Sequence, residues 1–199
     1  MLDTVIVISY RAREEHLKYY LENTVPLLQK HMPNSKIVII EQDWTNNLFN
    51  RGCLLNIGFN EYKDKTKYFM THDIDINPYE QTIIDYYTSD ISDNEFLGIY
   101  TFPNDSLGGI IRCKTETFFK TNGFPNDVWG WGAEDNALYF RAIHNNMKIS
   151  LNEYNKRYKN SNTSEGAKYF HIFNNIKDDN RINHYTNLQK YNFNVGNWS

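Results

Sequence analysis

The sequence predicts an α/β fold with a mostly parallel central sheet flanked by helices. Short runs of β-branched and aromatic residues alternate along the chain with segments that have helical apolar spacing. This alternation is typical of parallel sheets covered on both faces, which bind ligands at the carboxyl ends of their strands. A chain of 199 residues has the length of one ordinary domain rather than two. We therefore expect residues 1–199 to form a single domain.

The predicted elements follow one another without a repeat or an evident linker. Strands are expected at Thr4–Ser9, Lys36–Glu41, Tyr68–Thr71, Phe96–Tyr100 and Gly109–Arg112. Helices are expected at Glu14–Lys30, Gly52–Tyr62, Tyr79–Tyr87, Lys114–Lys120 and Glu134–Asn145. Pro26 is expected to kink or end the first helix, because proline has no amide hydrogen to donate.

Composition and charge exclude several classes of protein. The formal net charge of -3 leaves no overall basic surface, so nucleic acid is not an expected partner. The sequence has no long apolar segment of the kind that forms a transmembrane helix, signal peptide or membrane anchor. We therefore expect a cytoplasmic or otherwise soluble intracellular protein. Cys53 and Cys113 lack metal-ligand spacing and are expected to be small buried residues in a reducing compartment.

Two indoles and two adjacent carboxylates lie among glycines in the segment Asn122–Asp135. Indole faces suit the apolar faces of sugar rings, and a carboxylate beside them can accept a proton from a sugar hydroxyl. The same run is also compatible with a tight turn held by two packed indoles. The segment is therefore a candidate carbohydrate site.

A second pair of carboxylates, Asp73 and Asp75, follows the apolar and aromatic run Lys67–Thr71. If the strand stays extended, side chains two residues apart point the same way and both carboxylates face one site. Paired oxygen donors at the end of a strand suit a hard divalent ion that carries a diphosphate. An isolated Asp-x-Asp is also common in solvated turns, but its position after a buried strand favours a site.

Together these segments resemble the β-1,4-galactosyltransferase family, glycosyltransferase family 7. The resemblance rests, in order and spacing, on Val5–Leu17, Phe49–Phe59, His72–Asp75, Leu107–Ile110 and Asn122–Asp135. It runs from about the N-terminus to Ser150 and thins beyond it. The resemblance implies a GT-A glycosyltransferase fold, with the nucleotide-sugar and metal half in residues 1–110 and the acceptor half in residues 111–199.

The resemblance implies a UDP-sugar donor and a manganese ion, with magnesium as the alternative. Asp75 would be a direct metal ligand and His171 the second, although a histidine between aromatics is also typical of a packed strand. His184 and His144 are weaker candidates for that ligand. The nucleotide-sugar would contact Tyr10, Arg11, Arg13, Phe49, Arg51, Asp73, Ser106, Gly108, Gly109 and Trp131. Without the resemblance, these arginines would be ordinary surface residues and Phe49 a core residue.

The catalytic residues implied by the resemblance are Asp135, as general base, and its neighbour Glu134. A general base that activates a carbohydrate hydroxyl implies direct displacement with inversion at the anomeric carbon. Asp135 could alternatively be the N-cap of the following helix. Trp131 would belong to a mobile lid. The acceptor would contact Trp131, Glu134, Asp135, Asn136 and Ile182.

Two departures from the family pattern concern the substrates. Asn136 replaces a third carboxylate that the family uses for its acceptor, and Ser106-Leu107 replaces a Tyr-Phe pair beside the donor sugar. The smaller Ser106 leaves room for a C2 substituent, so we expect transfer of galactose or N-acetylgalactosamine. Two other functions stay open, namely a sugar- or nucleotide-binding protein without turnover and a metal-dependent UDP-sugar hydrolase.

Overall fold

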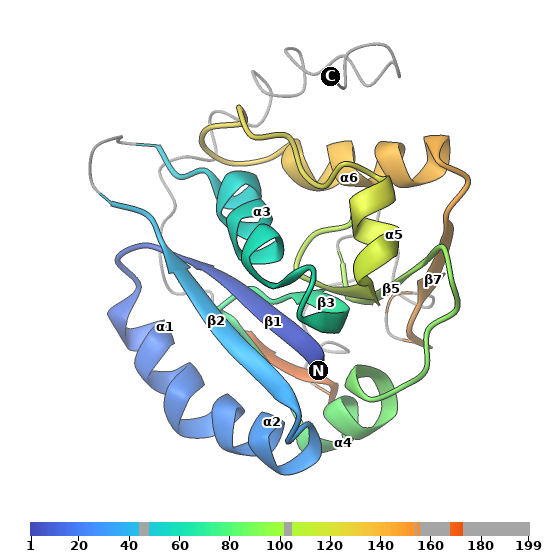
Figure 1. The fold of residues 1–199 in the computed structure, drawn as a ribbon. Coiled ribbons are helices and arrows are strands. Elements are labelled where there is room, and N and C mark those ends of the chain that lie inside the picture. The colour runs from blue at the N-terminus through green and yellow to red at the C-terminus, as the bar shows by residue number, and fades with distance from the viewer. Residues whose placement is uncertain (44–47, 102–104, 154, 156–167, 173–199) are drawn as a thin grey trace.

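A six-stranded sheet forms the centre of the computed structural model, which describes residues 1–43, 48–101, 105–153, 155 and 168–172 (Figure 1). The strand order is β2-β1-β3-β6-β5-β7. Their bounds are β1 Leu2–Tyr10, β2 Ser35–Glu41, β3 Thr66–Thr71, β5 Glu95–Tyr100, β6 Ile110–Lys114 and β7 Lys148–Leu151. Only β6 runs against its neighbours among these six, so the prediction of a mostly parallel sheet is confirmed. The sequence patterns did not reveal β7.

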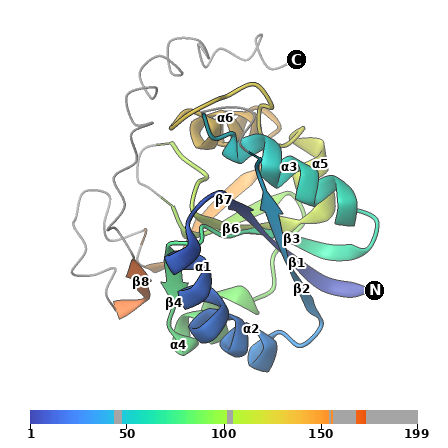
Figure 2. The ribbon, with the colours of Figure 1, turned by 90° about the vertical axis from the view of Figure 1, so that its left-hand side faces the viewer.

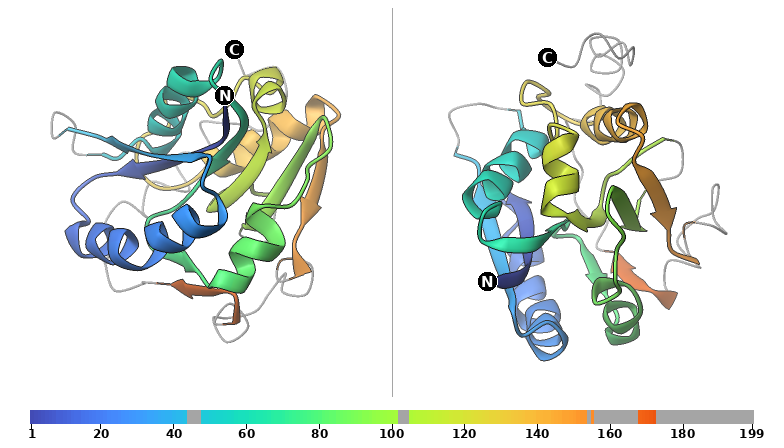
Figure 3. Two further views of the ribbon diagram at one scale, coloured as in Figure 1. Left: turned by 60° about the horizontal axis from the view of Figure 1, so that its bottom comes forward. Right: turned by 45° about the vertical axis from the view of Figure 1, so that its right-hand side comes forward.

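Helices cover both faces of this sheet (Figures 1 and 3). One face carries α1 (Glu14–Tyr19), α2 (Val25–His31), α4 (Glu80–Thr82) and its continuation η2 (Ile83–Tyr87). The other face carries α3 (Arg51–Tyr62), α5 (Thr115–Lys120) and α6 (Glu134–His144). Strand β1 shows why both faces are covered, because its side chains alternate between two hydrophobic cores. Ile6 and Ile8 pack into the core on the α1 side, and Val5 and Val7 pack into the core on the α3 side, all fully buried.

A second, two-stranded sheet lies on the α1 side, near α4 (Figure 2). It pairs β4 (Ile76–Pro78) with β8 (Phe170–Ile172) in antiparallel register. Neither three-residue strand was predicted, because such short segments carry too little periodicity to be recognised. This sheet brings the segment around His171 next to the turn that follows β3.

The first helix does not end at Pro26. A π-helical turn, η1 (Tyr20–Thr24), joins α1 to α2, and the backbone amide of Val25 donates to the carbonyl of Tyr20. The wider turn ends at Thr24, two residues before Pro26, whose missing amide hydrogen would interrupt a regular α-helix. The helix therefore continues through Pro26 to His31.

Helix α3 is held close to β1 by Gly58. A Cβ atom added to Gly58 would lie 2.4 Å from Val7 Cγ1, so only glycine permits this approach. At its other end, the side chain of Asn50 accepts a hydrogen bond of 3.0 Å from the Cys53 amide and caps the helix. These two contacts fix the position of the first residue of α3, Arg51.

No helix in the described part of the chain is long and apolar enough to cross a lipid bilayer. Cys113 is buried, Cys53 is partly exposed, and the two form no disulfide. Burial raises the pKa of the Cys113 thiol well above its usual value. The expectation that the cysteines are small buried residues thus holds fully for Cys113 and in part for Cys53.

Candidate active site

Segments that follow the carboxyl ends of β1 and β3 meet the start of α3 and the start of α6. The contacts that join them come from four places far apart in the sequence, and each contributes residues that the sequence singled out. Arg13 follows β1, Arg51 begins α3, Asp73 follows β3, and Glu134 and Asp135 begin α6. This is the end of the sheet at which α/β proteins bind ligands.

Arg51 lies at the centre of a carboxylate cluster formed by Asp73, Glu134 and Asp135. Its Nε donates to Asp73 Oδ1 at 2.9 Å and its Nη1 to Asp135 Oδ1 at 2.7 Å, while Glu134 Oε1 lies 3.8 Å from Nη1. Burial would lower the pKa of Arg51, but the carboxylates more than offset this effect and raise it. Arg51 is therefore a fixed positive charge that ties together residues 73 and 135.

Glu134 and Asp135 are neighbouring carboxylates, and the charge of Asp135 affects the pKa of Glu134. Burial, and then Asp135, raise the pKa of Glu134 to about 8, although Arg51 opposes this. Burial also raises the pKa of Asp135, and Arg51 opposes it there through a direct ion pair. Glu134 Oε2 is buried without a hydrogen-bond partner among the described residues. A pKa of about 8 favours a protonated Glu134 at neutral pH, and the direct ion pair with Arg51 favours the ionised form of Asp135.

Asp135 is not the N-cap of α6, so that interpretation is wrong. The N-cap is Ala133, which has a φ of 77° and makes no side-chain capping hydrogen bond, and Asp135 is the second helical residue. Ala133 adopts the left-handed backbone conformation there, and the carboxylate of Asp135 accepts from Arg51 Nη1.

The loop before β6 packs directly on Asp135. A Cβ atom added to Gly108 would lie 2.1 Å from Asp135 Oδ2, and the Leu107 amide donates to the Asp135 carbonyl at 3.1 Å. Asn136 donates to the Asp105 carbonyl at 2.9 Å and ties down the same loop. Gly109 adopts a φ of 63°. Ser106, which is half-buried, is thereby held beside the carboxylate cluster.

The segment 122–133 is anchored to α3 by two asparagines. Asn56 donates to the Phe124 carbonyl and accepts from the Phe124 amide, at 2.7 and 3.0 Å, and Asn50 donates to the Asn126 carbonyl at 2.7 Å. The indoles of Trp129 and Trp131 are 37% and 40% exposed. Part of each of these two side chains is therefore accessible to a ligand.

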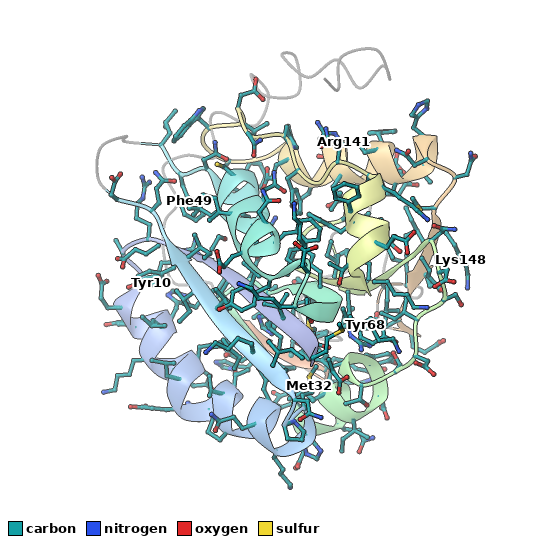
Figure 4. The ribbon with its side chains drawn as sticks, in the orientation of Figure 1. Tyr10, Met32, Phe49, Tyr68, Arg141 and Lys148 are labelled. Carbon is teal, nitrogen blue, oxygen red and sulfur yellow. The ribbon has the colours of Figure 1, made fainter. Side chains whose placement is uncertain are left out.

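Arg11 and Phe49, two predicted nucleotide contacts, lie together. The guanidinium carbon of Arg11 is 5.5 Å from the Phe49 ring centroid, and Nη1 donates to the Leu48 carbonyl at 3.1 Å. Figure 4 shows Phe49 just before α3 and Tyr10 at the end of β1. Tyr10 belongs to the core on the α1 side and is 6% exposed, so its ring offers little surface to a ligand.

Asp73 and Asp75 do not continue the strand. The Ile76 amide donates to the Asp73 carbonyl at 3.2 Å, which closes a turn, so the expectation of an extended segment is wrong. The two carboxylates still lie close enough for the charge of Asp73 to act on Asp75. Instead, Asp73 pairs with Arg51, and Asp75 pairs with Arg13 at 3.1 Å. Burial and Asp73 raise the pKa of Asp75, while Arg13 and His16 lower it.

Of the two proposed metal ligands, Asp75 fits a divalent cation better than His171. Asp75 is a half-buried carboxylate that already pairs with a cation. His171 is exposed, lies opposite Asn77 in the small sheet and stacks on Tyr19 with ring centroids 5.3 Å apart. Within the described ranges, no three His, Cys, Asp or Glu side chains converge as a metal site would. His144 is exposed at the far end of α6, and Ile182 and His184 lie outside the described residues.

Sequence reasoning missed the supporting role of His72, which is fully buried behind Asp73. Its Nδ1 lies 2.9 Å from the Asp73 carbonyl, and its Nε2 lies 2.9 Å from the Tyr87 hydroxyl. A carbonyl can only accept, so Nδ1 donates and Nε2 accepts from Tyr87. Burial lowers the pKa of His72 to about 4, which keeps the ring neutral. A histidine directly before the Asp-x-Asp was the available signal.

Comparison with known families and proteins agrees with this geometry. Residues 2–88 match the model described as the N-terminal region of glycosyl transferase group 7. Residues 94–166 match the model described as the N-terminal domain of galactosyltransferase. The β-1,4-galactosyltransferase 4 of Cricetulus griseus is 35% identical over 153 residues, which cover 73% of this chain and 44% of the relative. The β-1,4-galactosyltransferase 1 of Homo sapiens is 34% identical over 163 residues, covering 73% and 38%. The chain thus spans less than half the length of these relatives.

Solved structures share the fold. The Drosophila β-1,4-galactosyltransferase 7, a mutant in complex with manganese, UDP-Gal and xylobiose, has a TM-score of 0.71 and 23% identity, covering 87% of this chain and 72% of that one. The catalytic domain of the same Drosophila enzyme with xylobiose gives the same TM-score at 22% identity, covering 88% and 72%. The architecture is therefore the GT-A glycosyltransferase fold, and the chain belongs to the β-1,4-galactosyltransferase family, glycosyltransferase family 7.

Proposed function

We propose that this protein is an inverting, metal-dependent glycosyltransferase. It moves galactose or N-acetylgalactosamine from a UDP-sugar to a carbohydrate hydroxyl. The observation that carries the proposal is the cluster of Arg51 with Asp73, Glu134 and Asp135, named here the Arg51 cluster. It sets the candidate base Asp135 beside the donor-side Asp73 in one partly buried site. The names of the relatives and the UDP-Gal, manganese and xylobiose bound to the Drosophila neighbour support the same class of reaction.

The donor would bind between the Arg11 side and the Asp75 side of this site. Arg11 over Phe49 presents a cation and an aromatic face, which suit a phosphate and a base. Asp75, with His171 as second ligand, would hold Mn²⁺ or, alternatively, Mg²⁺. When bound, the ion supplies positive charge that stabilises the leaving diphosphate.

Asp135 would take the proton from the acceptor hydroxyl. The hydroxyl oxygen then forms a bond to the anomeric carbon while the bond to UDP breaks on the opposite face, which inverts the configuration. Glu134, protonated at neutral pH, can donate a hydrogen bond to a sugar hydroxyl. Trp131, which is 40% exposed, would close over the donor and form part of the acceptor site with Asn136 and Ile182.

Ser106 would set the donor sugar. It is half-buried next to the Gly108–Asp135 contact, where a small side chain leaves room for a C2 substituent. We expect the protein to use UDP-GalNAc as well as UDP-Gal. Side-by-side assays that detect turnover of UDP-Gal alone would rule out this donor hypothesis.

The test is UDP release from a panel of UDP-sugars with Mn²⁺, with and without monosaccharide and xyloside acceptors. The wild type is compared with Asp75→Ala and Asp135→Asn. The proposal expects acceptor-dependent release that both substitutions abolish. Tight UDP binding without release would identify a binding protein, and release that ignores the acceptor would identify a hydrolase.

A further inference from the structure

We propose that Arg51 is a positioning residue for the general base, in addition to any contact with the nucleotide. Its guanidinium orients the Asp135 carboxylate and is the one cation paired with it among the described residues. The inference rests on the proposed transferase function, because it assigns Asp135 the role of base.

Arg51 is held on several sides and cannot turn toward a ligand without breaking strong contacts. Its side chain is 12% exposed, its Nε and Nη1 are bound to Asp73 and Asp135, and its guanidinium carbon lies 5.7 Å from the Phe124 ring centroid. The Asn50 cap and the Gly58 contact with Val7 fix the helix that carries it. This placement is typical of a residue that builds a site.

The two oxygens of Asp135 have different surroundings. Oδ1 accepts from Arg51 Nη1 at 2.7 Å, so that oxygen is already committed. Oδ2 lies against Gly108, where a Cβ atom would come within 2.1 Å. Because Oδ1 is bound to Arg51, we assign acceptance of the proton to Oδ2, and Arg51 fixes the direction of Oδ2 by holding Oδ1.

The charges around Asp135 come from three elements. Arg51 on α3 pairs with it, Asp73 after β3 repels it, and Glu134 lies beside it on α6, while the loop before β6 contributes the contact of Gly108. Burial and Asp73 raise the pKa of Asp135, and Arg51 lowers it. A base works in its ionised form, so activity falls as the pH drops through this pKa. Loss of Arg51 should move that fall to higher pH.

Three variants separate positioning of the base from binding of the donor. Arg51→Met removes the positive charge and the guanidinium that binds two carboxylates at once. Arg51→Lys keeps the charge, but an ammonium group cannot bind both carboxylates in the same geometry. Arg11→Met is the matched control on the nucleotide side. For each, kcat and KM for the UDP-sugar are measured across pH. UDP affinity is measured by calorimetry and folding by thermal unfolding.

We expect Arg51→Met to lower kcat by about tenfold to a hundredfold and to move the acid limb of the kcat profile to higher pH. Arg51→Lys should lower kcat but keep the acid limb near its wild-type position. Arg11→Met should raise KM with little change in the profile. A rise in KM alone for Arg51→Met, or equal shifts of the acid limb in both Arg51 variants, would overturn the inference.

A readout without turnover distinguishes failure of the inference from failure of the proposed function. Carbon-13 NMR titration of the aspartate carboxyls, with Asp135→Asn to assign the signal, reports the pKa of Asp135 directly. An inactive wild type with a pKa that rises in Arg51→Met would defeat the transferase proposal alone. An active wild type whose pKa is indifferent to Arg51 would defeat the positioning role alone. If Arg51→Met does not fold, Arg51→Lys with Asp73→Asn provides the same comparison of fork and charge.

Discussion

The two arginine–aspartate contacts of the site differ in how firmly they are closed. Arg13 and Asp75 make one contact of 3.1 Å, and their side chains are 32% and 27% exposed. Arg51 is 12% exposed and lies among three carboxylates. A single, partly exposed pair is screened by water and exchanges partners at little cost, whereas several carboxylates around a largely buried arginine cost more to separate from it. The difference teaches that the proposed base is held by a largely buried arginine, while the carboxylate proposed to bind metal is paired with an arginine that water reaches.

The largest expected effect comes from Gly108→Ala, which would break the closed cluster. The new Cβ would fall on Asp135 Oδ2, so the carboxylate must move, and we expect kcat to fall on the order of a hundredfold. Gly58→Ala is the control, because its Cβ would strike Val7 in the core and should cost stability by about 1–3 kcal/mol. Turnover and thermal unfolding of both variants check this. Equal losses of stability, with turnover lost only in Gly58→Ala, would contradict the preorganised cluster.

Asp75→Asn tests the pair that Asp75 forms with Arg13. The single, partly exposed contact with Arg13 contributes only about 0–1 kcal/mol, so the apo protein should keep its melting temperature nearly unchanged. Stabilisation by added Mn²⁺ should disappear, because binding to the native state alone raises the apparent stability. Arg13→Met is the matched variant and should keep the response to Mn²⁺. A normal Mn²⁺ response in Asp75→Asn would remove this carboxylate as the ligand.

Glu134→Gln tests the Arg51 cluster through the pH dependence of the free energy of unfolding. The pKa of Glu134 is raised to about 8 in the folded protein from a usual value of 4.5. Its contribution to stability is therefore fully present below the unfolded pKa and is lost as pH rises toward the folded pKa. We expect the stability of Glu134→Gln relative to wild type to grow from pH 4.5 to about 8 and then level off. Denaturant unfolding across pH measures this, and a difference that does not vary with pH would count against a protonated Glu134.

The smallest effect is expected at His72, which hydrogen-bonds to the Asp73 carbonyl and to the Tyr87 hydroxyl. Tyr87→Phe removes the hydroxyl that donates to His72 Nε2, and we expect a loss of about 1 kcal/mol. Tyr20→Phe is the matched control, because the Tyr20 hydroxyl is buried without a hydrogen-bond partner among the described residues, and its removal should cost nothing. Chemical unfolding compares the two. A larger loss for Tyr20→Phe would show that the hydrogen bond does not support the turn.

The sequence predicted the main strands, the helices and the residues of the Arg51 cluster, because these depend on periodicity and on motifs with fixed spacing. It did not predict β4 and β8, since three-residue strands exist only through their pairing with each other. It also placed Asp73 and Asp75 on one extended face. That assumption failed because His72 and the Asp73–Ile76 turn bend the chain as soon as it leaves the strand.

The roles of Asp135 and Arg51 show a different limit. Spacing alone left Asp135 as either a base or an N-cap, and the positive φ of Ala133 decides against the cap. Arg51 was expected to face the nucleotide, and only the fold brings residues 73 and 135 within reach of one guanidinium. The assignment of residues 1–199 to one domain with two functional halves, and the intracellular location, stay predictions.

The π-helical turn at Tyr20–Thr24 sets an angle as well as a length. It inserts one extra residue between the part of the helix that carries Arg13 and His16 toward Asp75 and the part that packs Leu28 into the core. An α-helix turns by about 100° per residue, so deleting one residue here would restore a regular helix and swing one part against the other by that angle. Either Leu28 would leave the core or Arg13 would move away from Asp75. The π-helical turn thus sets the angle between the two parts of the helix, and with it the position of Arg13 and His16 at the site.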